Sequence, residues 1–68
     1  MMTTINVNGE AQNLSAETLA ALLAEKGIEG SRGLAVALNG AVVPRANWPS
    51  TKLNSGDDVE IVHAKQGG

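Results

Sequence analysis

The chain offers few side chains that could carry out catalysis. It contains no Cys and no Tyr, and its single histidine, His63, lies close to the C-terminus. The absence of Cys removes the thiol nucleophile, and one histidine without cysteines leaves too few ligands for a structural zinc ion. The adjacent carboxylates Asp57 and Asp58 follow Ser55 and Gly56, a composition typical of a turn rather than of a metal site. This inventory argues against a stand-alone enzyme and favours a carrier, a binding module or a subunit.

The C-terminal segment HAKQGG is the remaining candidate for chemistry. It ends on Gly67 and Gly68, so its last group is a carboxylate with no side chain beside it. A residue without a Cβ lets the backbone enter a narrow site and adopt φ values that other residues avoid. A frayed terminus would have the same composition, so the elements upstream must decide between the two interpretations.

Length and composition restrict the class of protein. The 68 residues are enough for one small domain, which we expect to span residues 1–62, with residues 63–68 as a flexible tail. The net charge is −2, there is no basic cluster, and Trp48 is the only aromatic residue, so nucleic acid is not an expected partner. No apolar run approaches the roughly 20 residues of a membrane span, and the N-terminus lacks the pattern of a secretory signal. We expect a cytoplasmic protein, monomeric when free, with no membrane partner.

Two Asn-Gly dipeptides predict two β-hairpins. They stand within the alternating segments TINVNGEAQNL and LAVALNGAVVP, and this dipeptide tolerates the positive φ angles of a type I′ turn. Pro44 limits pairing beyond the second hairpin. A further turn precedes a last strand, in which Val59 and Ile61 share one face.

Between the hairpins, residues 15–27 carry the pattern of one amphipathic helix. Ser15 is the expected N-cap, and Leu14 before it is expected to pack on Leu19 as a hydrophobic staple. Gly27 fits the left-handed position that ends a helix, with Ile28 packing back on the last turn. The expected buried stripe consists of Leu19, Leu22 and Leu23.

The element order is strand, strand, helix, strand, strand, strand, and a single helix must cover one face of a sheet. After the helix crossover, a parallel pairing of the third strand with a strand of the first hairpin is available. The last strand follows an irregular segment, in which Trp48 is the expected packing anchor, and can insert centrally beside the first strand. This arrangement is that of the α+β β-grasp, or ubiquitin-like, fold: a mixed sheet of about five strands with one helix packed on one face.

The sheet face away from the helix is expected to expose small residues. Alternation places Ala35, Ala37 and Val62 on this face, together with Glu60. A flat face of small side chains suits the docking of another protein. Arg45 is a further candidate contact for such a partner, with a solvated side chain or bracing of its own loop as the alternative.

Several motifs together resemble one family. The segments VALNGAVVPRANW and LNSGDDVEIV and the terminal QGG, in this order and across essentially the whole chain, resemble the sulfur-carrier proteins of thiamin biosynthesis, the ThiS family. The matching positions include Asn39, Trp48 and Gly56. Many members have small or apolar residues where this chain has Lys65 and Gln66. This departure bears on how the tail is seated but leaves the terminus intact.

The resemblance implies a specific use for the C-terminus. An adenylyltransferase of the ubiquitin-activating type would use ATP and magnesium to convert the Gly68 carboxylate into an acyl-adenylate. A persulfide donor would displace AMP and leave a thiocarboxylate, whose sulfur thiazole synthase takes. Gly68 is then the covalently modified residue, and Gly67 and Gln66 belong to the tail that enters the partner's active site. The chain itself would bind no cofactor and no metal.

Other functions are compatible with the same fold and ending. The small subunit of molybdopterin synthase is the nearest alternative, although the short chain and its Val-Pro-Arg and Trp pattern favour the thiamin branch. Three alternatives remain. The chain could be a carrier that supplies sulfur to cysteine or other products, a ubiquitin-like modifier joined to lysines through Gly68, or a passive interaction domain with an inert tail.

Overall fold

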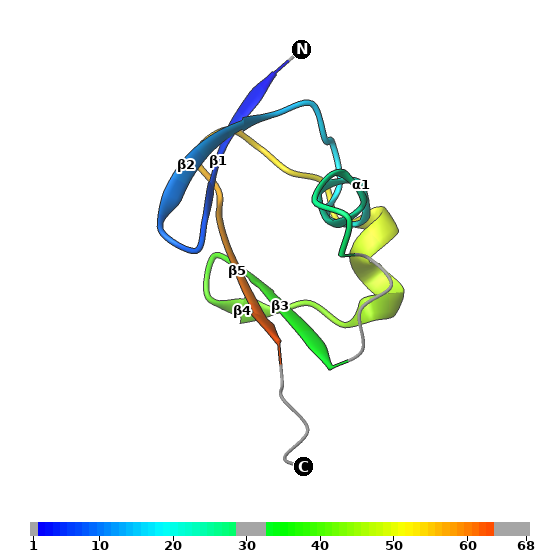
Figure 1. Cartoon of the computed structure of the whole chain (residues 1–68). Coiled ribbons are helices and arrows are strands. Elements are labelled where there is room, and N and C mark those ends of the chain that lie inside the picture. The colour runs from blue at the N-terminus through cyan, green and yellow to red at the C-terminus, as the bar shows by residue number, and fades with distance from the viewer. Residues whose placement is uncertain (1, 29–32, 64–68) are drawn as a thin grey trace.

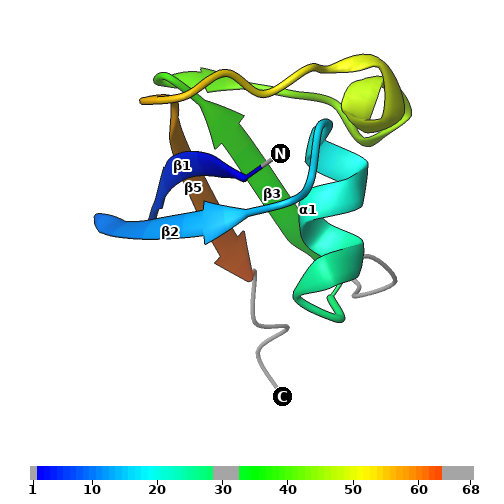
Figure 2. The ribbon, with the colours of Figure 1, turned by 90° about the horizontal axis from the view of Figure 1, so that it is seen from above.

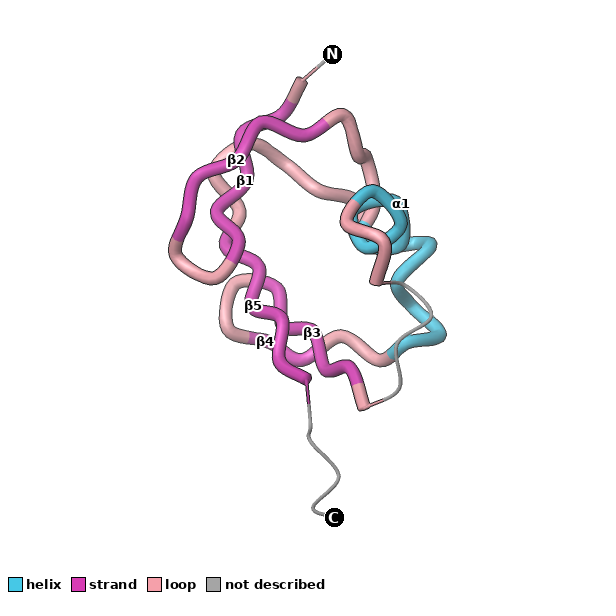
Figure 3. The backbone as a smooth tube through the Cα atoms, in the orientation of Figure 1, coloured by secondary structure: helices cyan, strands magenta, loops and turns pink. Residues whose placement is uncertain are grey.

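The structure is a computed structural model, and it describes residues 2–28 and 33–63. Its elements are β1 (Thr3–Val7), β2 (Glu10–Leu14), α1 (Leu19–Glu25), β3 (Leu34–Leu38), β4 (Ala41–Val42), the 3-10 helix η1 (Arg45–Ser50) and β5 (Asp58–His63). The strands lie on one side of the molecule, and α1 and η1 lie together on the other (Figures 1 and 3). Neither helix in this described part has the length and hydrophobicity needed to span a membrane.

The five strands form one mixed sheet in the order β2-β1-β5-β3-β4. The last strand, β5, lies between the two hairpins, parallel to β1 and antiparallel to β3. The central insertion beside the first strand is therefore confirmed, as is the five-stranded mixed sheet with one helix on one face. The expected parallel pairing of the third strand with the first hairpin is wrong, because β5 occupies that place. A central position suits β5, since its Val59 is 1% exposed.

The core lies between α1 and the inner face of the sheet (Figure 2). The three leucines of the predicted stripe are completely buried. Alternate positions of the strands supply the opposing layer, because side chains of a strand point to its two faces in turn. Its members are Ile5, Val7, Leu14, Val36 and Val59. The alternation that buries these residues leaves the intervening strand positions on the outer face.

Both predicted type I′ turns are present. Asn8 and Asn39 each have a φ of 50°, and the glycines that follow them have φ of 85° and 86°. Such two-residue turns fix the register of their hairpins. Val7 accordingly pairs with Glu10 in the first hairpin, and Leu38 pairs with Ala41 in the second.

Helix α1 begins later than the sequence indicated. Its N-cap is Thr18, whose Oγ1 accepts a hydrogen bond from Ala21 N at 3.1 Å. The expected cap at Ser15 is therefore wrong. The predicted staple is wrong as well, because Leu14 is no longer the residue before the cap, although it is buried in the same core as Leu19.

Tertiary pairing explains the later start of α1. The backbone at Thr18 is extended and pairs with the chain segment that leads toward β5. On either side of this bridge, Leu53 N donates to Glu17 O at 2.9 Å, and Leu19 N donates to Thr51 O at 3.0 Å. These contacts hold the chain extended where its local sequence alone would permit an earlier helical turn.

The C-terminus of α1 ends as predicted. Gly27 has a φ of 75° and donates its N–H to Ala24 O at 3.0 Å. Ile28 N donates to Leu23 O, also at 3.0 Å. These two bonds form the Schellman motif, in which a left-handed residue lets the chain satisfy the last helical carbonyls. Ile28 is half-buried against the core, as expected.

Gly27→Ala is expected to lower the free energy of unfolding by about 1 kcal/mol, because alanine resists a positive φ. A Cβ at this position would meet nothing within 4 Å, so backbone strain alone causes the loss. Gly27→Asn is the matched control and should cost less, since asparagine tolerates the left-handed region better. Urea denaturation of the three proteins measures the effect, and an alanine variant as stable as the wild type would contradict it.

Trp48 anchors the segment between β4 and β5, as predicted. Its side chain is 4% exposed, and its indole Nε1 donates to Val43 O at 2.8 Å. The helix η1 that contains it packs against α1 (Figure 1). The single aromatic residue of the chain therefore joins the irregular segment to the helical layer.

Candidate functional site

The candidate reactive group is the carboxylate that follows β5 along the chain. Gln66, Gly67 and Gly68, together with Lys65, lie outside the described residues. The structure describes the root of this segment, because β5 runs to His63, five residues before the C-terminus. His63 pairs with Leu34 of β3. The strand thus continues one residue beyond the expected domain boundary at residue 62.

Asn8 holds one edge of β5 through both its main chain and its side chain. Its backbone N donates to Val59 O at 2.9 Å. Its side chain then makes two bonds to Ile61: Oδ1 accepts from Ile61 N at 2.8 Å, and Nδ2 donates to Ile61 O at 3.2 Å. Strand β1 itself ends at Val7, which pairs with Val59. The amide of Asn8 thus continues the ladder after the main chain has turned away.

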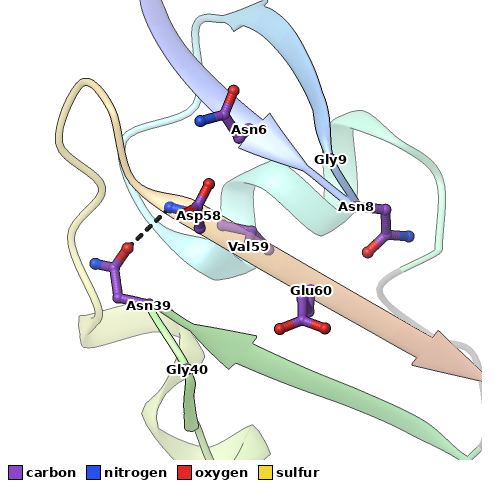
Figure 4. Close-up of a pocket in the computed structure, with 8 residues that line it drawn as sticks. All are labelled: Asn6, Asn8, Gly9, Asn39, Gly40, Asp58, Val59 and Glu60. Carbon is purple, nitrogen blue, oxygen red and sulfur yellow. Dashed lines mark hydrogen bonds between the residues drawn. The ribbon is translucent and has the colours of Figure 1, made fainter.

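Asn39 makes the corresponding contact on the other edge of β5. Its backbone N donates to Asp58 O at 2.7 Å, and its Oδ1 accepts from Asp58 N at 2.9 Å, as Figure 4 shows for the second bond. Its Nδ2 donates to Asp57 Oδ1 at 3.1 Å. Asn39 therefore holds β5 at its start, whereas Asn8 holds it near its end.

Sequence reasoning assigned these two asparagines to turns and missed their contacts with β5. The available signal was the choice of asparagine in both turns. Glycine also permits a positive φ, but only an amide side chain can donate and accept hydrogen bonds at once. This second property is the one that the structure uses.

Asp57 has the structural role that the sequence indicated. Its Oδ2 accepts from Asn54 N at 2.8 Å, and Gly56 within this turn has a φ of 90°. Among residues 2–28 and 33–63, no group of three or more potential metal ligands lies together. The carboxylate of Asp57 therefore shapes the turn that precedes β5.

An open polar hollow lies between the two Asn-Gly turns, at the end of the sheet where β5 begins (Figure 4). Amide side chains and two carboxylates, Asp58 and Glu60, give it a polar and acidic lining. The hollow is lined by Asn6, Asn8, Gly9, Asn39, Gly40, Asp58, Val59 and Glu60. Its polar character separates it from the apolar region farther along β3 and β5.

The sheet face away from α1 carries the predicted small residues. Ala35 pairs with Val62, and Ala37 pairs with Glu60. Val62 is 57% exposed. The second hairpin adds Val42, which pairs with Ala37 and is 75% exposed. The apolar patch, as we call Ala35, Ala37, Val42 and Val62, lines a shallow hollow beside Glu60.

Val42 was missing from the sequence-based description of this face, although the register of a two-residue turn places it opposite Ala37. Arg45 is the first residue of η1. Its Cζ is 4.7 Å from the centroid of the Trp48 ring, and η1, which contains both residues, packs against α1. Arg45 therefore contacts a side chain of its own loop, and its contact with a partner stays a prediction.

The sequence of this chain matches one known protein family. The model of the ThiS family matches residues 5–68. The sulfur carrier protein ThiS of Thermus thermophilus is 40% identical over 62 residues, which cover 91% of this chain and 95% of that protein. A thiazole synthase of Paramagnetospirillum magneticum is 43% identical over 63 residues. That match covers 91% of this chain but only 19% of the synthase.

Solved structures share the fold. The crystal structure of the thiamine biosynthesis protein (ThiS) from Geobacter metallireducens has a TM-score of 0.81 and 29% identity, covering 97% of this chain and 100% of that one. A chain in the complex of subunits 1 and 2 of the molybdopterin-converting factor from Helicobacter pylori has a TM-score of 0.57 and 26% identity, with full coverage of both chains. The present structure therefore resembles the first more closely than the second.

Proposed function

Because this chain belongs to the ThiS family, we propose that it is a sulfur carrier of thiamin biosynthesis, which holds sulfur as a thiocarboxylate on Gly68. The observation that carries this proposal is the extent of the family match, which runs to residue 68 and so includes both terminal glycines. In this role the protein is a co-substrate. It brings the reactive group, and its partners supply the catalysis.

Loading requires activation, because a carboxylate is a poor electrophile. A Gly68 oxygen attacks the α-phosphorus of ATP, pyrophosphate leaves, and an acyl-adenylate forms. A persulfide sulfur attacks the carbonyl carbon and AMP leaves; a second thiol then cleaves the sulfur–sulfur bond and releases the thiocarboxylate. ATP and magnesium are held by an adenylyltransferase of the ubiquitin-activating type. The glycines contribute an unhindered carbonyl and a backbone that fits a narrow site.

Thiazole synthase is the proposed acceptor of the sulfur. In support, a segment similar to this chain makes up about a fifth of a protein named thiazole synthase, since the match covers 19% of its length. Two domains that share one chain encounter each other at a high effective concentration. The same two domains on separate chains would need an interface.

The apolar patch is the surface proposed to form that interface with the partner enzymes. It combines two exposed valines with two alanines, so a partner can approach the sheet closely over this area. Glu60 beside it supplies a charge that orients the partner, because charged groups at an interface set register more than affinity. The apolar patch also lies along β5, which leads toward the C-terminus.

Ala37→Arg is expected to weaken binding to the adenylating enzyme by at least about tenfold, because a long charged side chain would stand in the centre of a close apolar contact. Ala11→Arg is the matched control. Ala11 is exposed on the same sheet face, but in edge strand β2, where it pairs with Asn6. Calorimetric titration of both folded variants measures the effect, and unchanged affinity of the Ala37 variant would remove the apolar patch from the interface.

Sulfur transfer tests the proposed function itself. The chain is loaded with labelled sulfur from a persulfide donor, isolated, and mixed with thiazole synthase and its other substrates. The label should pass to the thiazole product, with at most one sulfur transferred for each carrier chain. Lysine-linked adducts without transfer would favour the ubiquitin-like modifier, and transfer only to a molybdopterin precursor would favour the nearest alternative.

A further inference from the structure

The two edges of β5 are held differently near its end. On the β3 edge, the ladder continues to the pair of Leu34 and His63. On the β1 edge, the main-chain pairing stops at Val7 and Val59. Within residues 2–28 and 33–63, the hydrogen bonds to Ile61 on that edge come from the side chain of Asn8. One amide therefore secures this edge closest to the C-terminus.

Asparagine meets three demands at position 8. The turn needs a φ of 50°, Ile61 N needs an acceptor, and Ile61 O needs a donor. Glycine satisfies the first demand only, and aspartate satisfies the first two. Each hydrogen bond lost from the end of a strand is expected to raise the local opening equilibrium by about threefold to tenfold. Loss of the whole amide should therefore loosen the last residues of β5.

The C-terminal segment of the chain begins directly after β5. Five residues separate His63 from the end of the chain, and an extended segment of that length spans at most about 17 Å. Such a short connection makes the reach of the terminal carboxylate depend on where β5 ends and in which direction. An adenylating site needs the reacting atoms within about 3.5 Å of each other. A loosened strand end is expected to spread the carboxylate over more positions and to lower the fraction of chains in which it fits the site.

We infer that Asn8 is a positioning residue for the loading of Gly68, which it serves by fixing the end of β5 through its two bonds to Ile61. The inference rests on the proposed function. In this role Asn8 acts through β5 and not on the reacting atoms, so its loss should change how much carrier the partner needs more than the rate of the chemical step.

Asn39 provides a matched control on the same strand. It has the same φ, occupies the same position of the same turn type, and bonds β5 at Asp58 instead of Ile61. It also bonds Asp57, so Asn39→Gly removes at least as many hydrogen bonds as Asn8→Gly. A general loss of stability should therefore be as large in the control as in the test variant.

The test is the kinetics of ATP–pyrophosphate exchange by the adenylating enzyme with the full chain as substrate. Asn8→Gly should raise the KM for the carrier about five- to tenfold and change kcat less than about twofold, whereas Asn39→Gly should leave KM within about twofold. Asn8→Asp, which keeps the acceptor for Ile61 N, should give an intermediate KM. Amide hydrogen exchange of the free proteins should accelerate at Ile61, whose N–H donates to Asn8 Oδ1, in Asn8→Gly beyond the acceleration in Asn39→Gly.

An unchanged KM for Asn8→Gly, or equal increases in both glycine variants, would overturn the inference. Equal exchange rates at Ile61 in the two variants would overturn it independently of any partner. A wild-type chain that supports no pyrophosphate exchange would instead overturn the proposed function, and the wild-type reaction alone reveals that case.

Discussion

Removal of Gly68 is expected to reduce adenylation of the chain by at least about 10³-fold, because it withdraws the reacting carboxylate from the partner's site. The shortened chain still ends on a glycine carboxylate, that of Gly67, so the chemistry of the terminus is unchanged. Its position differs by one residue, about 3.5 Å along an extended chain. A displacement of about 1 Å already costs about a hundredfold in rate where reacting atoms must be aligned. ATP–pyrophosphate exchange measures the loss.

Gly68→Ala separates the effect of the position of the carboxylate from the effect of steric crowding beside it. It keeps the length of the chain and adds only a Cβ beside the carboxylate, so its loss of rate should be smaller than that of the deletion. The free energy of unfolding of both variants should lie within about 0.5 kcal/mol of the wild-type value, since the change lies five residues beyond β5. A deletion variant that is adenylated at nearly the wild-type rate would show that the partner does not depend on the position of Gly68.

Trp48→Ala is expected to lower the free energy of unfolding by about 3–5 kcal/mol, the usual cost of removing a large buried aromatic side chain. The side chain is 4% exposed and joins η1 to the core. A small domain without disulfides has a total stability of only about 3–5 kcal/mol. The variant should therefore be largely unfolded at room temperature, as measured by far-ultraviolet circular dichroism during denaturation.

Trp48→Phe is the control for the size of the side chain. Phenylalanine retains most of the buried ring but cannot donate the hydrogen bond to Val43 O. The loss should then be about 1–2 kcal/mol, close to that of one hydrogen bond with its acceptor left unpaired. An alanine variant as stable as the wild type would show that the loop before β5 does not depend on this anchor.

The elements that were predictable from the sequence are those fixed by local chemistry. The two Asn-Gly turns and the glycine that ends α1 each impose a backbone angle that few residues adopt, and all three are present. The start of α1 was not predictable from local sequence, because the pairing of Thr18 with a distant segment decides it. The partner of β3 was likewise set by β5, which lies later in the chain and takes the central place.

The residues on the outer face of the sheet were largely predictable from the sequence, but the contacts that hold β5 were not. Strand alternation was enough to place Ala35, Ala37 and Val62 on the outer face. The two hydrogen bonds between Asn8 and Ile61 could not be predicted from the sequence, because they join residues 53 positions apart and depend on the final strand order. The roles of the tail residues Gln66, Gly67 and Gly68 stay predictions, which rest on the sequence and on family membership.

The intact mass of the chain after loading tests the central claim most directly. The protein is incubated with its adenylating enzyme, ATP with magnesium, a persulfide donor and a free thiol that cleaves the sulfur–sulfur bond, and then fragmented in the mass spectrometer. Because the chain has no cysteine, sulfur that it gains cannot be bound to a cysteine side chain. The account predicts the exchange of one oxygen for one sulfur, confined to the fragment that contains Gly68. An unchanged mass, or added sulfur in a fragment that lacks the C-terminus, would contradict it.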